Sequence, residues 1–135
     1  MFSKKPSKPQ SRIDSLIGTG TRIEGNITFS GGLRIDGEVV GNVTASSEDQ
    51  PSTLVVSEHA QITGDIRVSH LVVNGMITGP LYASEFVELQ SHSRVTGDVH
   101  YKTLEIQLGA MVDGRLVHDN GNTAKSVELK LASSN

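Results

Sequence analysis

One five-residue phrase decides the fold of this chain. It reads Ile62-Thr63-Gly64-Asp65-Ile66, with a glycine midway between two aliphatic residues. The phrase recurs along the chain, and one glycine from each predicted turn gives the repeat glycines Gly25, Gly41, Gly64, Gly79, Gly97 and Gly114. The steps between them are 16, 23, 15, 18 and 17 residues. Self-similarity at a nearly constant period is the signature of a solenoid built from stacked repeats.

The one long step contains an insertion. The run Ser46–Ser52 in this step is polar and includes a proline, which is typical of a loop between repeats. Without about six residues of this loop, the long step also becomes roughly 17 residues.

Short alternating runs precede the glycine phrases. They are Leu54-Val-Val56, Leu71-Val-Val73, Val87-Glu-Leu89 and Leu104-Glu-Ile106. Alternation with period two indicates β-strands, because successive side chains of a strand point to opposite faces. No segment shows a helical period over ten or more residues. Each repeat is therefore predicted to hold three short strands, with glycines at corners or where backbones pack closely.

These repeats predict an all-β fold, a single-stranded parallel β-helix of about six turns with roughly 17 residues per turn and disordered termini. Each strand would pair with its copy in the next turn at about 4.8 Å. Two inward-facing columns are expected to form the core. The column before the glycines is Ile23, Val39, Ile62, Ile77, Val95 and Val112, and the column after them is Ile27, Val43, Ile66, Leu81, Val99 and Leu116.

The composition fits a narrow tube. Val, Ile and Leu make up 34 of the 135 residues, whereas aromatic residues are 4% of the chain and Trp is absent. Similar aliphatic side chains stack well in such a core, and bulky indoles do not fit. There is no Cys, which excludes disulfides and thiolate metal sites.

The charge is divided between a basic tail and an acidic body. Residues 1–12 hold four of the twelve Lys and Arg and none of the fifteen Asp and Glu, so they carry +4 and the other 123 residues carry −7. An acidic body repels phosphate, so nucleic acid is not expected as a partner. The tail is a candidate membrane-targeting peptide for an anionic membrane surface, and a solubilising role is the alternative. Its expected membrane contacts are Met1, Phe2, Lys4, Lys5 and Lys8.

The expected division of the chain is a flexible tail over 1–12, a β-helix domain over 13–118, and a C-terminal tail or partial last turn over 119–135. No capping helix is evident at either end of the β-helix, so each end would expose unpaired backbone groups to another subunit. The run Ser126–Leu131 alternates again and is either a seventh partial turn or a strand that folds back as a lid. The candidate polymer ends are Leu16, Ile17, Leu104, Ile106, Val127 and Leu129.

We find no basis for catalysis in the sequence, and the chain is not expected to be an enzyme or to use a metal or a cofactor. The five histidines, His59, His70, His92, His100 and His118, have no metal-binding spacing. His59 and His92 fall at similar places in their repeats and are expected at exposed corners. The phosphate-binding loop of nucleotide-driven polymers is absent. No membrane span or signal peptide is apparent, so a cytoplasmic location is expected.

The repeated phrase, the single small β-helix and the opening Met-Phe-Ser-Lys-Lys resemble the bactofilins, which are bacterial cytoskeletal polymers. The resemblance covers roughly residues 14 to 118. It implies a right-handed, triangular β-helix that stacks end to end into non-polar filaments without nucleotide. It also implies a scaffold on the inner face of the cytoplasmic membrane, acting in cell shape or in localising envelope proteins. Envelope or cell-wall enzymes would be its further partners.

Two other classes of protein share features with this chain. A hexapeptide-repeat acyltransferase or carbonic-anhydrase-like trimer is a left-handed β-helix with an aliphatic residue every six positions, and residues 71–101 follow that spacing. The run over 56–68 follows it out of phase, and no histidine set for a trimer interface is present. A passive binding solenoid would need a regular Thr face and a secretion signal, and neither is evident.

Overall fold

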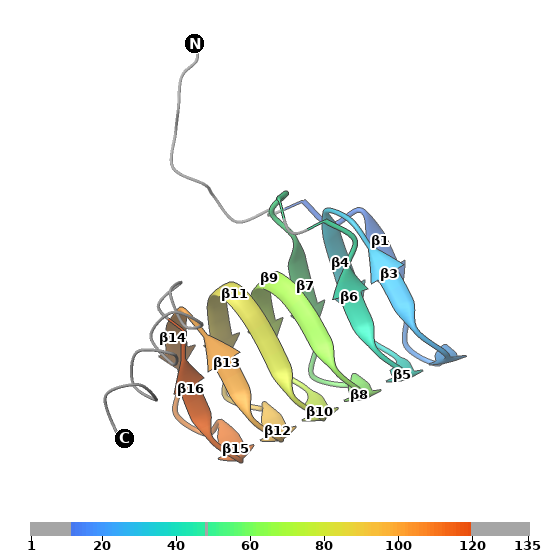
Figure 1. The fold of residues 1–135 in the computed structure, drawn as a ribbon. Helices are drawn as coiled ribbons and strands as arrows, with labels where there is room; N and C mark the ends of the chain where they lie inside the picture. The colour runs from blue at the N-terminus through green and yellow to red at the C-terminus, as the bar shows by residue number, and fades with distance from the viewer. Residues whose placement is uncertain (1–11, 48, 120–135) are drawn as a thin grey trace.

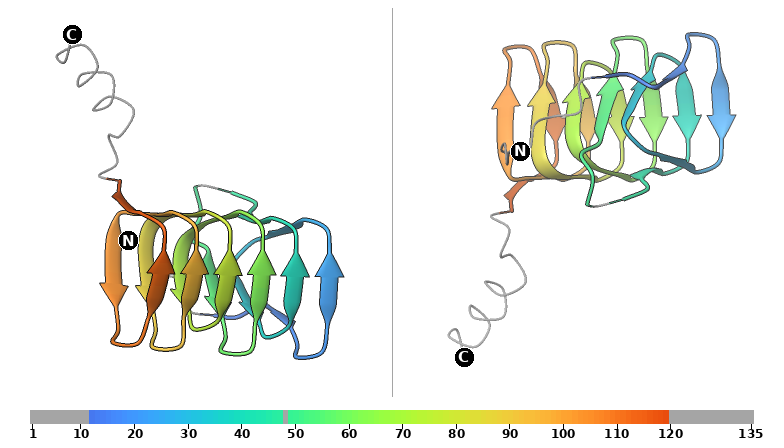
Figure 2. Two further views of the ribbon diagram at one scale, coloured as in Figure 1. Left: turned by 90° about the horizontal axis from the view of Figure 1, so that it is seen from below. Right: turned by 90° about the horizontal axis from the view of Figure 1, so that it is seen from above.

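The computed structural model describes residues 12–47 and 49–119, and in these residues it contains sixteen β-strands and no helix. The strands wind into six turns, from the blue end to the red end of the ribbon in Figure 1. Every strand pair is parallel and joins one turn to the next, as the two views of Figure 2 also show. The predicted all-β solenoid of about six turns is confirmed.

Each turn places one strand segment on each of three faces. Face one consists of β1 (Ser15–Ile17), β4 (Gly32–Ile35), β7 (Thr53–Val56), the second halves of β9 (Ile66–Val73) and β11 (Leu81–Leu89), and β14 (Thr103–Ile106). Face two consists of β2 (Arg22–Glu24), β5 (Glu38–Val40), β8 (Gln61–Thr63), β10 (Met76–Thr78), β12 (Arg94–Thr96) and β15 (Met111–Asp113). Face three consists of β3 (Ile27–Phe29), β6 (Val43–Ala45), the first halves of β9 and β11, β13 (Val99–Tyr101) and β16 (Leu116–His118).

The strand register aligns the aliphatic residues that flank the glycines. Ile62, for example, pairs with Val39 in the preceding turn and with Ile77 in the following turn. The pairing continues through both columns from the first turn to the last. In the four inner turns these side chains are at most 2% exposed, and they form the core with the inward residues of face one.

The first and last turns bury these columns less completely than the inner turns do. Leu116 is 44% exposed, and Ile23, Ile27 and Val112 are only half-buried. These residues belong to the first and last turns, where a neighbouring turn covers one side only. Their sequence pattern is the same as in the inner turns, so only the ends of the solenoid set them apart.

The repeat glycines form a ladder of close backbone contacts. A Cβ on Gly41, Gly64, Gly79, Gly97 or Gly114 would come closer than 3.0 Å to the carbonyl oxygen of the repeat glycine one turn earlier. Gly25, in the first turn, has open space at the same position. Gly79 also has a φ of +141°, a conformation that L side chains rarely adopt. Glycine is therefore required here both by contact and by backbone conformation.

Four corners between faces one and two share a turn that closes on a small residue. The N–H of that last residue donates to the carbonyl oxygen three positions earlier, as in Ala60 to Ser57 at 3.0 Å and Ser93 to Gln90 at 3.0 Å. Ala60 and Ser93 are both almost completely buried. The Ser93 hydroxyl, unlike the Ala60 methyl, is polar, and it has no hydrogen-bond partner within the described residues.

Replacing Ser93 with alanine is expected to stabilise the fold by about 1 kcal/mol, because it removes a buried hydroxyl without a partner. Ala60 shows that a methyl group fits the equivalent corner. Urea denaturation followed by circular dichroism would measure the change. The reverse substitution, Ala60→Ser, is the matched control and should destabilise the fold. A Ser93→Ala protein that is less stable than the wild type would contradict this account.

A buried histidine lies at the corner between faces three and one. His70 is 7% exposed, and its Nδ1 lies 2.9 Å from the Ser69 hydroxyl. The backbone N–H of His70 donates to the Ser52 carbonyl oxygen at 2.9 Å. Burial lowers the pKa of His70 from its usual value of 6.5, although the negative charge of Glu85 acts in the opposite direction. The folded chain therefore favours the neutral imidazole.

The stability contributed by neutral His70 should be complete above pH 6.5 and decline as the pH falls below it. In that range the unfolded chain binds a proton that the folded chain resists. His70→Gln should reduce this decline, whereas His59→Gln, at an exposed corner, should retain it. Denaturation midpoints of the three proteins at pH 7.5 and pH 5.5 would measure the difference. Equal declines in all three would exclude His70 as the cause.

Candidate polymerisation surfaces

The two ends of the solenoid are the part of the described chain with unsatisfied strand edges. The strands of the first turn, β1, β2 and β3, pair only with the second turn. The strands of the last turn, β14, β15 and β16, pair only with the fifth. In the part of the chain that the structure describes, no helix or further strand covers either end. Each end therefore presents three strand edges to another molecule.

Individual backbone groups show what the C-terminal end lacks. In the fifth turn, the Gly97 N–H donates to the Asp113 carbonyl oxygen at 2.9 Å, and the Val99 N–H donates to the Arg115 oxygen at 2.8 Å. The equivalent donors of the last turn are the N–H groups of Gly114 and Leu116, and the described residues provide no following turn to accept from them. A subunit stacked on this end would supply the missing acceptors.

Apolar side chains gather at the C-terminal end. Its exposed large apolar residues are Ile106, Leu108, Met111 and Leu116, and we call this set the C-terminal edge. Leu108 is 95% exposed, at the corner between β14 and β15. The sequence prediction missed Leu108, although the equivalent corner positions of other turns carry polar residues such as Thr19 and Ser91. A leucine among polar corner residues is the signal that could have identified it.

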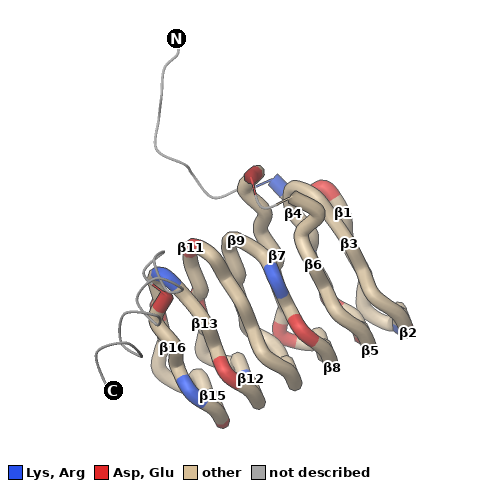
Figure 3. The backbone as a smooth tube through the Cα atoms, viewed as in Figure 1, with Lys and Arg blue, Asp and Glu red and all other residues tan. Residues whose placement is uncertain are grey.

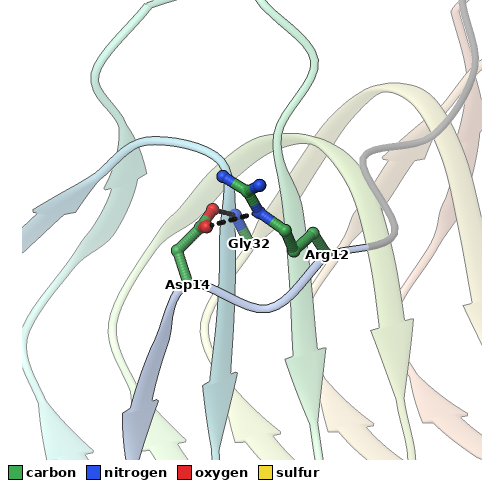
Figure 4. Close-up of polar contacts among 3 residues, drawn as sticks. All are labelled: Arg12, Asp14 and Gly32. Carbon is green, nitrogen blue, oxygen red and sulfur yellow. Dashed lines mark hydrogen bonds and ion pairs between the residues drawn. The ribbon is translucent and has the colours of Figure 1, made fainter.

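The N-terminal end has a smaller exposed apolar set. Leu16 is 60% exposed, Ile13 is also exposed, and the neighbouring Ile17 is half-buried. Asp14 holds the start of the first turn in place. Its carboxylate accepts from the Gly32 N–H at 3.0 Å and from Arg12 Nε at 3.0 Å (Figure 4). The Asp14 N–H in turn donates to the Gly32 carbonyl oxygen at 2.9 Å. The first turn is thus bound to the second at its very start.

Several charges near the ends lie beside an opposite charge in the same subunit. Arg22 lies beside Glu24 and Glu38 near the N-terminal end, and Arg115 lies 3.0 Å from Asp98 near the C-terminal end. Hydrogen bonds from Arg115 lower the pKa of Asp98 from its usual value. Acidic and basic residues are interspersed along the tube in Figure 3, with no block of one sign at either end. Contact between the ends would therefore depend on apolar burial and backbone hydrogen bonds.

The structure places the sequence-predicted polymer residues as follows. Leu16 and Ile106 are exposed at opposite ends, and Ile17 and Leu104 are half-buried beside them. The remaining two, Val127 and Leu129, lie outside the described residues, as do Met1, Phe2, Lys4, Lys5 and Lys8.

Residues 12–47 and 49–119 contain no cluster of three or more potential metal ligands. They also contain no helix long and apolar enough to cross a membrane.

Within the described residues the fold is a parallel β-solenoid with unpaired strand edges at both ends. The chain matches the family described as "Bactofilin: Polymer-forming cytoskeletal" over residues 15–117, and it belongs to that family. The resemblance seen in the sequence is confirmed. Bactofilins are structural cytoskeletal proteins rather than enzymes, and the family description implies that they associate with themselves.

Two curated relatives come from Myxococcus xanthus (strain DK1622). The chain is 29% identical to bactofilin BacP over 117 residues, which cover 86% of this chain and 47% of BacP. It is also 29% identical to bactofilin BacO over 106 residues, which cover 78% of this chain and 80% of BacO. The chain therefore spans about half the length of BacP. No solved structure matches the chain significantly.

Proposed function

We propose that this protein is a bacterial cytoskeletal scaffold whose subunits stack end to end, without nucleotide, into non-polar filaments. The observation that carries the proposal is that the described residues leave both ends uncovered, each with three unpaired strand edges and exposed aliphatic side chains. Strand edges of this kind recruit further strands, and apolar burial adds to the attraction. Neither source of energy requires a nucleotide.

Non-polar stacking means that like ends meet. In such an isologous contact, each C-terminal edge would be buried against an identical edge. Head-to-tail stacking that continues the solenoid would instead place β16 of one subunit on β3 of the next, with Leu116 near Ile27. The resemblance to the family favours the first arrangement.

The absence of Cys from the chain allows a direct test of both assembly and polarity. Single cysteines would be placed at Ile106, Leu108, Met111 and Leu116, with Thr78→Cys on the exposed side of the solenoid as control. Negative-stain microscopy without nucleotide should show filaments, and mild oxidation should give disulfide dimers for at least one edge variant and none for the control. Absence of filaments would contradict stacking. Disulfides that form only when Ile27→Cys and Leu116→Cys proteins are mixed would contradict non-polar assembly.

We further propose that the filaments attach to the inner face of the cytoplasmic membrane through residues 1–12. The motivation is the charge of +4 in this segment, combined with Met1 and Phe2 at its start. Each basic residue near an anionic leaflet contributes roughly 1 kcal/mol, so one tail binds weakly. Many tails on one filament bind much more strongly through their effective concentration. Assembly and attachment therefore reinforce each other, and the bound filament would organise cell shape or hold envelope proteins in place.

Sedimentation with anionic liposomes tests the attachment. Wild-type protein should sediment with the liposomes, whereas Phe2→Ala and the double variant Lys4→Glu/Lys5→Glu should remain largely in the supernatant. Filament formation by each variant, checked by microscopy without liposomes, separates a loss of membrane binding from a loss of assembly. Equal sedimentation of all three proteins would refute a role for this tail in attachment.

A further inference from the structure

Two irregularities of the repeat meet at one place on the side of the solenoid. The first is the inserted loop between β6 and β7. The second is a pair of small residues in an inward column of face three, where Ala45 follows Phe29 and Ala83 follows Val68. Together they leave a groove of about 460 Å³ at the corner between faces three and one. It is lined by the loop residues Ser47 and Ser52 and by Val68 and Ala83 of face three. The groove runs along the side of the solenoid as far as Asp119, the residue that follows β16.

One wall of the groove is a stack of three side chains from successive turns. Arg67, Tyr82 and His100 occupy one register position on face three. The Arg67 Cζ atom lies 4.0 Å from the centre of the Tyr82 ring, and the His100 ring is stacked on Tyr82 with centroids 4.5 Å apart. Both faces of Tyr82 are therefore covered, so a sugar or a base cannot stack on it. The same contacts hold the Arg67 guanidinium in place at the groove wall.

Arg67 has no carboxylate partner within the part of the chain that the structure describes. In contrast, Arg22, Arg34 and Arg115 each form an ion pair. A planar guanidinium that is already oriented by stacking loses little freedom when it binds, and its paired N–H groups match a carboxylate or a phosphate. Ser84 supplies an exposed hydroxyl group to the groove. The hydroxyls of Ser52 and Ser69 also line the groove but are already engaged, since Ser69 Oγ donates to the Ser52 carbonyl oxygen at 2.7 Å and Ser52 Oγ accepts from the Ser69 N–H at 3.0 Å.

Two carboxylates, those of Glu85 and Asp119, also line the groove, and their negative charges would oppose the binding of an anion. Glu85 lies 3.6 Å from Lys102 Nζ, so its charge is balanced by that lysine. Asp119 is at the C-terminal side, where its N–H donates to the Tyr101 carbonyl oxygen at 2.6 Å. Among the described residues that line the groove, Arg67 is the one lysine or arginine.

We propose that this groove binds an oxyanion, a carboxylate or a phosphate group, through a bidentate contact with Arg67 and a hydrogen bond from the Ser84 hydroxyl. The site goes beyond the scaffold function because it is on the side of the solenoid. A filament would leave it open and repeat it once per subunit, as a row of anion sites along its length.

The composition of the chain supplies a spectroscopic probe of the groove. There is no Trp, and Tyr82 and Tyr101 are the two tyrosines, so all tyrosine fluorescence comes from this region. The full-length protein would be titrated with inorganic phosphate and, separately, with glutarate, and binding would be followed by this fluorescence and by calorimetry. Saturable binding of at least one probe is expected, and the tighter probe identifies the preferred oxyanion.

Four variants test the assignment of residues. Arg67→Gln should weaken binding about tenfold or more, and Arg67→Lys should weaken it several-fold because the bidentate geometry is lost. Glu85→Gln should tighten binding, because it removes a negative charge from the groove. Arg94→Gln is the matched control, since Arg94 is also exposed and forms no ion pair within the described residues but lies on face two. It should leave binding unchanged.

Two outcomes would overturn the proposal. One is that neither probe binds saturably to the wild-type protein. The other is that Arg94→Gln weakens binding as much as Arg67→Gln does, which would indicate non-specific attraction. Circular dichroism of each variant confirms folding, and filament formation by Arg67→Gln separates failure of this site from failure of the scaffold function.

Discussion

Replacing Gly79 with alanine is expected to destabilise the solenoid by at least about 3 kcal/mol, enough to unfold a large fraction of the protein. The new Cβ would overlap the carbonyl oxygen of Gly64 in the preceding turn, which belongs to backbone that is itself paired. The φ of +141° at Gly79 adds conformational strain. Relief would require the turns to separate, and this would break hydrogen bonds on both adjacent faces.

Thermal and urea denaturation, followed by circular dichroism, would measure this effect. Gly18→Ala is the matched control, because a Cβ at Gly18 meets nothing within 4 Å and its φ is not in the left-handed region. The control should unfold at nearly the wild-type midpoint. If Gly79→Ala and Gly18→Ala were equally stable, close packing of the glycine ladder would not be what holds the turns together.

Replacing Leu116 with glutamate is expected to abolish filament formation at concentrations where the wild-type protein assembles. Leu116 is 44% exposed in the subunit, and its burial between subunits would contribute about 1 kcal/mol or more. A glutamate would instead place a charge in an apolar contact, at a cost of several kcal/mol. In an isologous contact two such charges would also repel each other. The critical concentration for assembly should therefore rise by at least about a hundredfold.

Sedimentation of filaments over a range of protein concentrations would measure the critical concentration. Met76→Glu is the matched control, because Met76 is also 44% exposed but lies on face two in an inner turn. Both variants should remain folded, and only Leu116→Glu should fail to assemble. Loss of assembly in both variants would point to lateral contacts, and normal assembly of Leu116→Glu would exclude the C-terminal edge.

The register of the whole solenoid could be predicted from the spacing of its glycines. Parallel strands in a solenoid stack each repeat on the next, so equivalent residues of successive repeats become neighbours. Ile62 and Ile77, for example, pair in the structure at the positions that the phrase assigns to them. The 23-residue step did not disturb this agreement, because the extra residues leave the stack as a loop between β6 and β7.

Three features could not be predicted in this way. Leu116 has the pattern of a core residue, and its exposure follows from being in the last turn. His70 looks like an ordinary polar residue, and its burial follows from packing at the corner between faces three and one. The groove beside Arg67 requires Ala45, Ala83 and the inserted loop to meet in space, and these lie in different turns.

The sequence by itself determined the class of fold, the number of turns and the partners of each strand. It could do so because a repeat encodes the same local structure each time, and stacking then allows one register. Only the tertiary structure decided which members of a column are exposed, where a side groove opens and which charges are left unbalanced. Those properties depend on where the stack ends and on which residues of neighbouring turns face each other, and no single repeat contains that information.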